Sequence, residues 1–195
     1  MMGMSQSRYG QMLLQMLTSI ILLAYPIMVY FGLKLGGIKL VAPLLIVILT
    51  IRLYVTRTSI KHFLWLMRLG VVFGISLAML SWYFRTNEWL LYYPLIVNVL
   101  FLIVFSYTLF NPPPIIERLA RLTEPNLPLQ AIAYTRKVTF IWCMFFIMNG
   151  AITLGTIIKG NLVWWTLYNG AISYFLIGIL IGGEWLVRQL SLIHI

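Results

Sequence analysis

Residues 134–188 read YTRKVTFIWCMFFIMNGAITLGTIIKGNLVWWTLYNGAISYFLIGILIGGEWLVR, which is two long apolar runs joined by a short Lys-Gly-Asn turn. Each run is long enough to cross the ~30 Å hydrocarbon core of a bilayer as a helix. The phrase Asn-Gly-Ala-Ile, followed by Thr or Ser, begins at Asn149 in the first run and at Asn169 in the second. Both copies lie about ten residues from the turn, roughly 15 Å along a helix. An antiparallel hairpin therefore sets Gly150 opposite Gly170 near the bilayer centre.

The composition excludes a water-soluble domain. Of the 195 residues, 62% are hydrophobic and only 9% are charged, and the mean hydropathy is +0.95. A soluble domain carries about a quarter charged residues. The formal net charge of +10 would suggest a nucleic-acid partner if the protein were soluble. Here the basic residues fall between apolar runs, so we interpret them as membrane-topology signals and predict no nucleic-acid partner.

Six apolar runs predict six membrane-spanning helices. The first run resembles a signal peptide because Arg8 precedes it, but it is too long and no small-x-small cleavage site follows, so we expect a retained helix. The second run is short and has Pro43 in its first turn, where a missing N–H is tolerated. We predict an all-α polytopic transmembrane helix bundle in which the chain, 1–195, is a single membrane domain. The expected spans are about 11–33, 39–55, 62–84, 88–110, 137–158 and 162–187.

The distribution of basic residues predicts the orientation of these spans. If the N-terminus is cytoplasmic, ten basic residues fall on the cytoplasmic side and four on the other side. The ten are Arg8, Arg52, Arg57, Lys61, Arg68, Arg118, Arg121, Arg136, Lys137 and Arg188, and the four are Lys34, Lys39, Arg85 and Lys159. Because cytoplasmic loops carry an excess of Lys and Arg, we expect both termini in the cytoplasm.

The one long connection, residues 111–136, has the sequence NPPPIIERLARLTEPNLPLQAIAYTR. Its three prolines end the preceding helix. An apolar stripe at helical spacing then runs opposite Glu117, Arg118 and Arg121, which predicts a short cytoplasmic helix in the membrane interface. Each arginine would contribute on the order of 1 kcal/mol on an anionic lipid surface. A helix that docks a partner protein has the same pattern, so Arg118 and Arg121 are a candidate lipid or partner surface.

Three asparagines are expected at nearly the same depth in three spans. Asn98 lies about ten residues into the fourth span, level with Asn149 and Asn169. Unpaired amide groups cost several kcal/mol in hydrocarbon. One interpretation is that the amides bond to one another across helices that neighbouring glycines allow to approach closely. The other is that they line a polar cavity for a substrate headgroup.

A Tyr-Pro pair occurs in two of the spans. Tyr25-Pro26 lies deep in the first span, and Tyr93-Pro94 lies nearer the outer end of the fourth. A proline inside a helix frees a backbone carbonyl, because proline has no N–H to donate. The shared phrase hints at two three-helix halves of opposite topology, an arrangement found in transporters.

Glu184 lies in the last turn of the sixth span, where a negative charge opposes the helix dipole. Arg188 is one turn further on, and Arg136 opens the fifth span at the same level. We predict that Glu184 forms an ion pair with these arginines and so holds the ends of the hairpin together. A proton or substrate site is the alternative.

The sequence contains no pattern that supplies enzymatic chemistry. It has no His/Asp/Glu cluster with metal-ligand or acid–base spacing, no nucleophile elbow, no P-loop and no dinucleotide fingerprint. The single cysteine, Cys143, lies in an apolar run and suggests no metal site. We predict no metal and no cofactor, and the residues favour a non-enzymatic protein over an enzyme.

Three runs resemble a known group of proteins: PPPIIERLAR (112–121), YTRKVTFIWCMFFIMNGAI (134–152) and LYNGAISYFLIGILIGGEWLVR (167–188). They are similar to an uncharacterised family of small polytopic bacterial inner-membrane proteins. Genes of that family often lie beside fatty-acid-synthase-like and acyltransferase genes for aryl polyene lipids. The resemblance implies a multi-pass protein of the bacterial inner membrane, where acyl products are assembled or moved, and it transfers no functional residue.

Three functions follow as expectations. The first is a non-enzymatic partner that organises a lipid or aryl polyene biosynthetic assembly through the basic segment. Its partners would be the lipid bilayer and membrane-associated acyl-chain biosynthetic proteins. The second is a small transporter or flippase for a lipid-like product, which would use the three asparagines. The third is an enzyme whose site the sequence does not reveal. The sequence alone favours the first.

Overall fold

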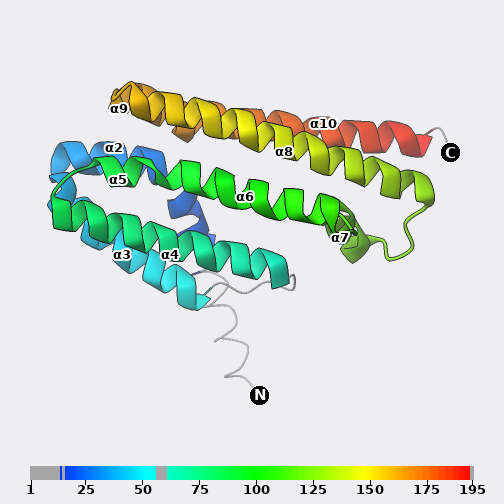
Figure 1. The fold of residues 1–195 in the computed structure, drawn as a ribbon, viewed down its shortest axis with the longest axis horizontal. Coiled ribbons are helices and arrows are strands. Elements are labelled where there is room, and N and C mark those ends of the chain that lie inside the picture. The colour runs from blue at the N-terminus through cyan, green and yellow to red at the C-terminus, as the bar shows by residue number, and fades with distance from the viewer. Residues whose placement is uncertain (1–13, 15, 56–60, 194–195) are drawn as a thin grey trace, which may run out of the picture.

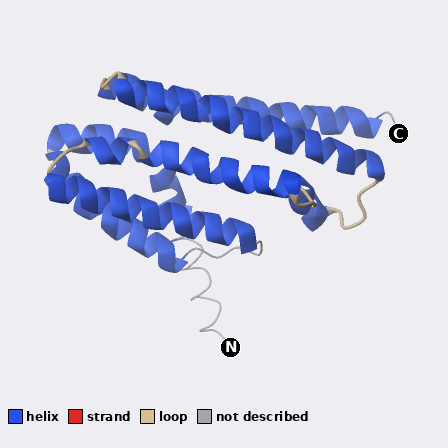
Figure 2. Cartoon of the chain, viewed as in Figure 1, coloured by secondary structure: helices blue, strands red, loops and turns tan. Residues whose placement is uncertain are grey.

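The computed structural model describes residues 14, 16–55 and 61–193. Within these ranges every regular element is a helix, as Figure 2 shows. The elements are α2 (Tyr25–Leu35), α3 (Gly37–Val55), α4 (Lys61–Phe84), α5 (Glu88–Leu91), α6 (Tyr93–Phe110), α7 (Ile115–Thr123), α8 (Leu129–Ile158), α9 (Leu162–Leu167), η1 (Tyr168–Ile172) and α10 (Ser173–Ile193). A helical segment, Met16–Leu23, precedes α2. The long helices form one bundle (Figure 1), so the predicted all-α class is confirmed.

Five stretches of the described chain are long and apolar enough to cross a membrane, and a bent helix pair makes a sixth if it counts as one span. The five are Gly37–Tyr54, Leu64–Phe84, Glu88–Phe110, Leu129–Ile158 and Leu162–Val187, and the bent pair is Met16–Leu23 with Tyr25–Leu35. A helix needs about 20 apolar residues to cross the hydrocarbon core, and these stretches approach or exceed that length. The chain is therefore a multi-pass membrane protein.

A bent helix pair lies where the sequence predicts one continuous first span over 11–33. Its two helical parts meet at Ala24 at an angle of 70°. Pro26, in the first turn of α2, has no N–H to give to the carbonyl of Leu22, so an unbroken helix would lose a hydrogen bond here. Part of the predicted span lies outside the described residues.

The fifth span begins earlier than predicted. α8 starts at Leu129, directly after Pro128, whereas the predicted span begins near 137. The apolar run marks the part of a helix that lies in the membrane, and here the helix continues beyond that run. Residues 129–136 therefore belong to α8, and the connection predicted over 111–136 ends at Pro128.

The two ends of the bundle differ in their connections. α7 and the C-terminal part of α10 lie at one end, and the α2–α3, α4–α5 and α8–α9 turns lie at the other (Figure 1). Gly37 and Gly160 supply the positive φ angles, 63° and 66°, that two of these turns use. The cytoplasmic placement of the α7 end stays a prediction.

Two clusters of buried apolar side chains hold the bundle together. One joins α2, α3, α4, α5, α6 and α9, and the other joins α6, α7 and α8. Both clusters reach a common cavity: Tyr25 and Tyr93 line it from the first, and Phe105, Ile116 and Phe146 line it from the second. Some of the side chains that pack the bundle therefore also form the wall of that cavity.

Candidate functional site

A cavity of about 760 Å³ lies inside the bundle and is partly open to the outside. Its wall comes from Met16–Leu23, α2, α6, α8, η1 and α10, with α7 at one end and one side chain from α3. Small-molecule sites commonly measure about 300–1,000 Å³, so this cavity can hold a ligand. Its polar and charged lining includes Ser19, Arg52, Asn98, Asn149, Asn169, Ser173 and Glu184. The three asparagines singled out in the sequence therefore reach one cavity.

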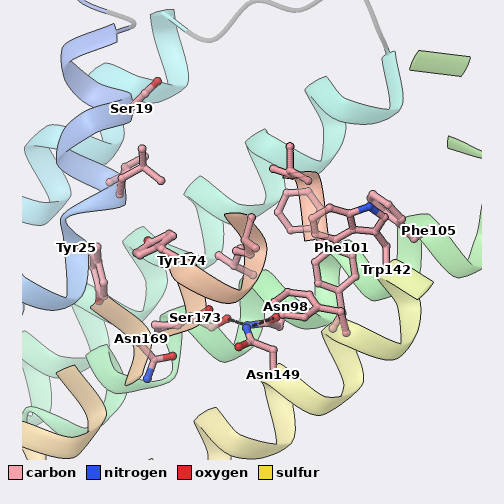
Figure 3. A pocket seen from close by; sticks show the side chains of 18 of the residues that line it. Ser19, Tyr25, Asn98, Phe101, Phe105, Trp142, Asn149, Asn169, Ser173 and Tyr174 are labelled. Atoms are coloured by element: carbon pink, nitrogen blue, oxygen red, sulfur yellow. Dashed lines mark hydrogen bonds between the residues drawn. The ribbon is translucent and has the colours of Figure 1, made fainter. Parts of the chain in front are cut away.

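α6 and α8 bring Asn98 and Asn149 into direct contact, as Figure 3 shows. Nδ2 of Asn149 donates to Oδ1 of Asn98 over 2.9 Å, and Nδ2 of Asn98 donates to the carbonyl of Pro94 over 2.9 Å. Gly150 faces this contact: a Cβ at that position would lie 3.6 Å from Leu95 and 3.7 Å from Asn98, which is ordinary van der Waals contact. The bonds offset the cost of burying the amides in the membrane.

Asn169 takes part in a second set of bonds beside the first. Its Oδ1 accepts from the Thr153 hydroxyl, and its Nδ2 donates to the carbonyl of Trp165, both over 2.9 Å. The hydroxyl of Tyr168 donates to Oδ1 of Asn149 over 2.8 Å and links the two sets. One buried network therefore joins α6, α8, α9 and η1. The asparagines bond across helices and also line the cavity, so the two interpretations of the layer are compatible.

The glycines beside the asparagines do not face each other, contrary to the hairpin geometry expected from the sequence. Gly150 faces α6, whereas Gly170 faces α2, where an added Cβ would lie 3.2 Å from Ile27 and 3.5 Å from Pro26. The expectation rested on depth alone, and the rotation of each helix about its axis decides which neighbour a residue meets. The two glycines thus face different helices, and only at Gly170 is the packing too tight for a Cβ to fit without a shift.

The sixth span contains a π-helical turn that the sequence analysis did not predict. This turn, η1, lies between α9 and α10 and carries Asn169 and Gly170. A π-helical turn closes i→i+5 hydrogen bonds and is frequent at functional sites. The one signal in the sequence is the Tyr-Asn-Gly phrase in mid-span, since Asn and Gly have low α-helical propensity.

The two Tyr-Pro pairs meet at the cavity wall. The ring centroids of Tyr25 and Tyr93 lie 4.6 Å apart, and each pair begins a helix, α2 or α6. The Tyr25 hydroxyl donates over 2.9 Å to the carbonyl of Leu90. Pro94, four residues further on, has no N–H to give to that carbonyl. The repeated phrase therefore forms a contact between the first and fourth spans, and the proposed pair of opposite-topology halves stays a prediction.

Aromatic rings form the part of the cavity wall next to Asn98 (Figure 3). The rings of Phe101 and Phe146 stack with centroids 5.4 Å apart, and Phe105 meets Phe146 edge-on at 5.1 Å. The ring centroids of Trp142 and Phe146 lie 5.7 Å apart. These rings offer a broad apolar, polarisable surface next to the polar layer.

Arg52 is a charged lining residue that the sequence analysis missed, since it was assigned only a topology role. Only 8% of its surface is exposed, and it lines both the main cavity and a smaller one of about 120 Å³. Its Nη1 donates to Oγ of Ser19 over 2.6 Å and to Oγ1 of Thr18 over 3.3 Å. Arg52 lies in the last turn of α3, which ends at Val55. A basic residue near the end of a span is typical of a topology signal, so the sequence carries no signal for its burial at the cavity.

Glu184 of α10 also lines the cavity. The hydroxyl of Tyr134 donates to the backbone carbonyl of Glu184 over 3.4 Å, so this part of α8 approaches the end of α10. No ion pair joins Glu184 to Arg136 among the described side chains, and Arg136 is exposed. Arg136 is two positions from Tyr134 and so lies on a different face of α8. The side chain of Arg188 lies outside the described residues, so that half of the predicted ion pair stays a prediction.

α7 covers one end of the cavity. Ile116, Leu119, Ala120 and Thr123 line it, and Ile115 is fully buried. The predicted short helix is present, but its apolar face packs on α6 and α8 of the same chain instead of standing free for lipid. The sequence could not show this, because an apolar stripe looks the same whether it meets lipid or protein.

Arg118 and Arg121 are bonded within the connection that carries α7. Arg121 pairs with Glu117 over 2.7 Å and donates to the carbonyl of Pro125 over 3.0 Å. Nε of Arg118 donates to the carbonyl of Pro113 over 2.7 Å. The arginines therefore hold α7 and its flanking turns in place, whatever else contacts them.

Within the described residues, no group of three or more His, Cys, Asp and Glu side chains could hold a metal ion. Comparison with protein-family models, curated proteins and solved structures gives no match. The fold and the site define the class instead. The chain is a multi-pass helical membrane protein whose bundle encloses a cavity with polar, aromatic and cationic parts.

Proposed function

We propose that this chain is a carrier for a lipid-like molecule, which it holds in the cavity of the bundle. The observation that carries the proposal is the mixed character of the wall. Asn98, Asn149 and Asn169 offer hydrogen bonds in the middle of the spans, and the rings of Phe101 and Trp142 offer apolar surface beside them. An amphiphile has the matching division into a polar head and an apolar chain.

The interruptions of the helices support a carrier. The bend at Ala24, the start of α6 at Tyr93 and the π-helical turn η1 all border the cavity. In many transporters, discontinuous spans build the substrate site near the middle of the membrane, because free backbone groups are tolerated only where they meet protein or line a cavity.

The packing of α10 supports entry of a ligand from the side. The main helix contacts of α10 are with η1, from which it continues. Further along, Ile177, Ile181 and Glu184 line the cavity. A span that borders a cavity over several turns can move away from the bundle without breaking an extensive interface.

The bonds of Arg118 and Arg121 favour the carrier over the partner protein expected from the sequence, because these side chains have a structural role within the chain. The family resemblance suggests the setting of the activity: a bacterial inner membrane in which acyl or aryl polyene products are made. Membrane-associated acyl-chain biosynthetic proteins would then supply the cargo.

The test places a large side chain in the cavity at the end that α7 covers. Ala120 of α7 lines the cavity, whereas Leu122 on the same helix is 64% exposed and does not. The wild-type protein and the variants Ala120→Trp and Leu122→Trp are purified in mild detergent. Native mass spectrometry then measures bound lipid, and a fluorescent-lipid flipping assay in liposomes measures transport.

We expect bound lipid and lipid flipping with the wild type and with Leu122→Trp, and loss of both with Ala120→Trp. A wild-type protein that retains no lipid and flips none would overturn the proposal. So would an Ala120→Trp variant that retains lipid and transport at the wild-type level, because the cavity would then not be the site.

A further inference from the structure

We infer that the cavity holds an uncharged lipid head that carries hydroxyl groups, and that the hydroxyls of Tyr93, Ser173 and Tyr174 bind it. This inference rests on the proposed carrier function and names the chemical class of its cargo. All three side chains line the cavity, and none of their hydroxyls makes a hydrogen bond within the described residues. Figure 3 shows Ser173 and Tyr174 among the side chains of the wall.

Ser173 directly follows the π-helical turn η1 and is only 7% exposed. A hydroxyl on a helix commonly donates to the carbonyl four residues earlier, as those of Thr139 and Thr166 do over 2.8 Å. Ser173 makes no such bond within the described chain, although Asn169 lies four residues before it. Its hydroxyl is therefore left for a group inside the cavity.

Tyr93 differs from the ring it packs against in the same way. The centroids of Tyr25 and Tyr93 lie 4.6 Å apart, and the Tyr25 hydroxyl donates to the carbonyl of Leu90. The Tyr93 side chain is 9% exposed, and its hydroxyl makes no hydrogen bond in the part of the chain that the structure describes. Tyr174, half-buried on α10, adds a third hydroxyl of this kind. Buried hydroxyls ordinarily have a partner, so these mark a place for one.

The unpartnered hydroxyls of Tyr93 and Ser173 are not sealed inside the protein. Among the described residues, the side-chain atoms that lack both a partner and accessible surface are the hydroxyl oxygens of Ser81 and Thr86, and neither residue lines the cavity. The hydroxyl oxygens of Tyr93 and Ser173 therefore keep accessible surface. Because both side chains are otherwise buried and line the cavity, a ligand in the cavity can reach these oxygens.

A head with hydroxyls fits these groups better than a head that only accepts hydrogen bonds. Each wall hydroxyl can donate one hydrogen bond and accept others. Hydroxyls of the cargo have the same two capacities, whereas an ester has no hydrogen to donate. Each amide nitrogen of Asn98, Asn149 and Asn169 makes one hydrogen bond and has a second N–H. The asparagine layer thus has further donors for the oxygens of the same head.

The charges of the lining favour an uncharged head. Among the described residues, the charged side chains that line the cavity are Arg52 and Glu184. Their formal charges are of opposite sign and cancel, so the wall has no net charge that would draw an ionic head into the bundle. Recognition is then left to hydrogen bonds between uncharged groups.

The experiment compares three compounds with the same hexadecanoyl chain. The head of 1-hexadecanoylglycerol carries hydroxyls, methyl hexadecanoate has an ester that only accepts hydrogen bonds, and hexadecanoate is an anion. Each compound is added to the purified protein in a neutral detergent at neutral pH, and native mass spectrometry measures its affinity. The wild type should bind 1-hexadecanoylglycerol more tightly than either of the others, by roughly two- to tenfold for each hydrogen bond gained.

Three single variants test the hydroxyls: Tyr93→Phe, Ser173→Ala and Tyr174→Phe. Each should reduce the preference for 1-hexadecanoylglycerol over methyl hexadecanoate by roughly two- to tenfold and leave the affinity for the methyl ester unchanged. The matched controls are Tyr83→Phe and Ser76→Ala, which remove exposed hydroxyls outside the cavity. The three variants break no hydrogen bond of the described chain, so their thermal stability without added lipid should match that of the wild type.

Equal affinity of the wild type for 1-hexadecanoylglycerol and the methyl ester would overturn the inference and leave the carrier proposal standing, and so would tighter binding of hexadecanoate. An undiminished preference in the folded variants would also overturn it. Each variant tests its own hydroxyl, so the test holds when one of the three does not fold. Failure of the wild type to bind any of the three compounds would instead count against the carrier itself.

Discussion

The hydroxyl of Tyr25 donates a hydrogen bond of 2.9 Å to the carbonyl oxygen of Leu90. Pro94 has no N–H for that carbonyl, and the indole of Trp165 donates to the next one, that of Leu91, over 3.1 Å. Side chains from the first and sixth spans therefore complete the backbone hydrogen bonding of the fourth. In a membrane such partners are required, because no bulk water replaces them.

Tyr25→Phe should lower the free energy of unfolding by about 1–3 kcal/mol, because the ring stays while the carbonyl of Leu90 loses the hydroxyl that donates to it. Thermal unfolding of the detergent-solubilised protein measures the change. Tyr83→Phe is the control, since Tyr83 is 81% exposed. A Tyr25→Phe variant as stable as wild type would show that this carbonyl finds another donor.

The contact between Asn98 and Asn149 should appear as an energetic coupling. A double-mutant cycle with Asn98→Ala and Asn149→Ala is expected to give about 0.6–1.7 kcal/mol, the range for hydrogen bonds between membrane helices. The same cycle with Asn98 and Asn169, which share no hydrogen bond in the structure, should give a value near zero. Equal coupling in both cycles would contradict the two-part network.

Gly74→Ala should destabilise the bundle, and Gly70→Ala on the same helix should not. A Cβ at Gly74 would lie 2.8 Å from the ring of Tyr93 and 2.8 Å from Leu49, whereas one at Gly70 would be 3.9 Å from its nearest neighbour. Overpacking of this kind typically costs about 1–3 kcal/mol. Unfolding midpoints of the two variants provide the measurement, and similar midpoints would contradict the close packing at Gly74.

Arg121→Gln should loosen α7, because Glu117, only 4% exposed, would lose its cation. We expect stability to fall by about 1–3 kcal/mol and limited proteolysis in the 111–128 connection to become faster. Lys137→Gln is the control, since Lys137 is basic, exposed and in the N-terminal part of α8. If Arg121→Gln is cleaved at the wild-type rate, Arg121 does not hold α7 in place, and its predicted role in a lipid or partner surface is favoured instead.

The helices were predictable because apolar runs of span length have few alternatives. Depth along a helix was predictable as well, since it depends only on residue count, and it correctly placed Asn98 level with Asn149. Rotation about the helix axis was not, so Gly150 and Gly170 were wrongly set opposite each other. An apolar stripe also does not reveal its partner, and α7 therefore looked like a helix lying on lipid.

Arg52 shows why part of the site was missed. The excess of basic residues near helix ends explains such an arginine as a topology signal. In the structure it is buried and donates to Ser19 and Thr18, which lie on the helical segment that precedes the bend at Ala24. The sequence contains Pro26, which favours a bend, but it does not show which residues of other spans the bent segment meets.

The π-helical turn η1 also fixes which side of α10 faces inward. Ser173, Ile177, Ile181 and Glu184 lie three or four residues apart and form one stripe along the cavity. Removing one residue from the turn would restore α-helical bonding and rotate everything after it by about 100°. The stripe would then point elsewhere, although no residue of α10 had changed. The inner surface of the last span is therefore set by the number of residues that precede it.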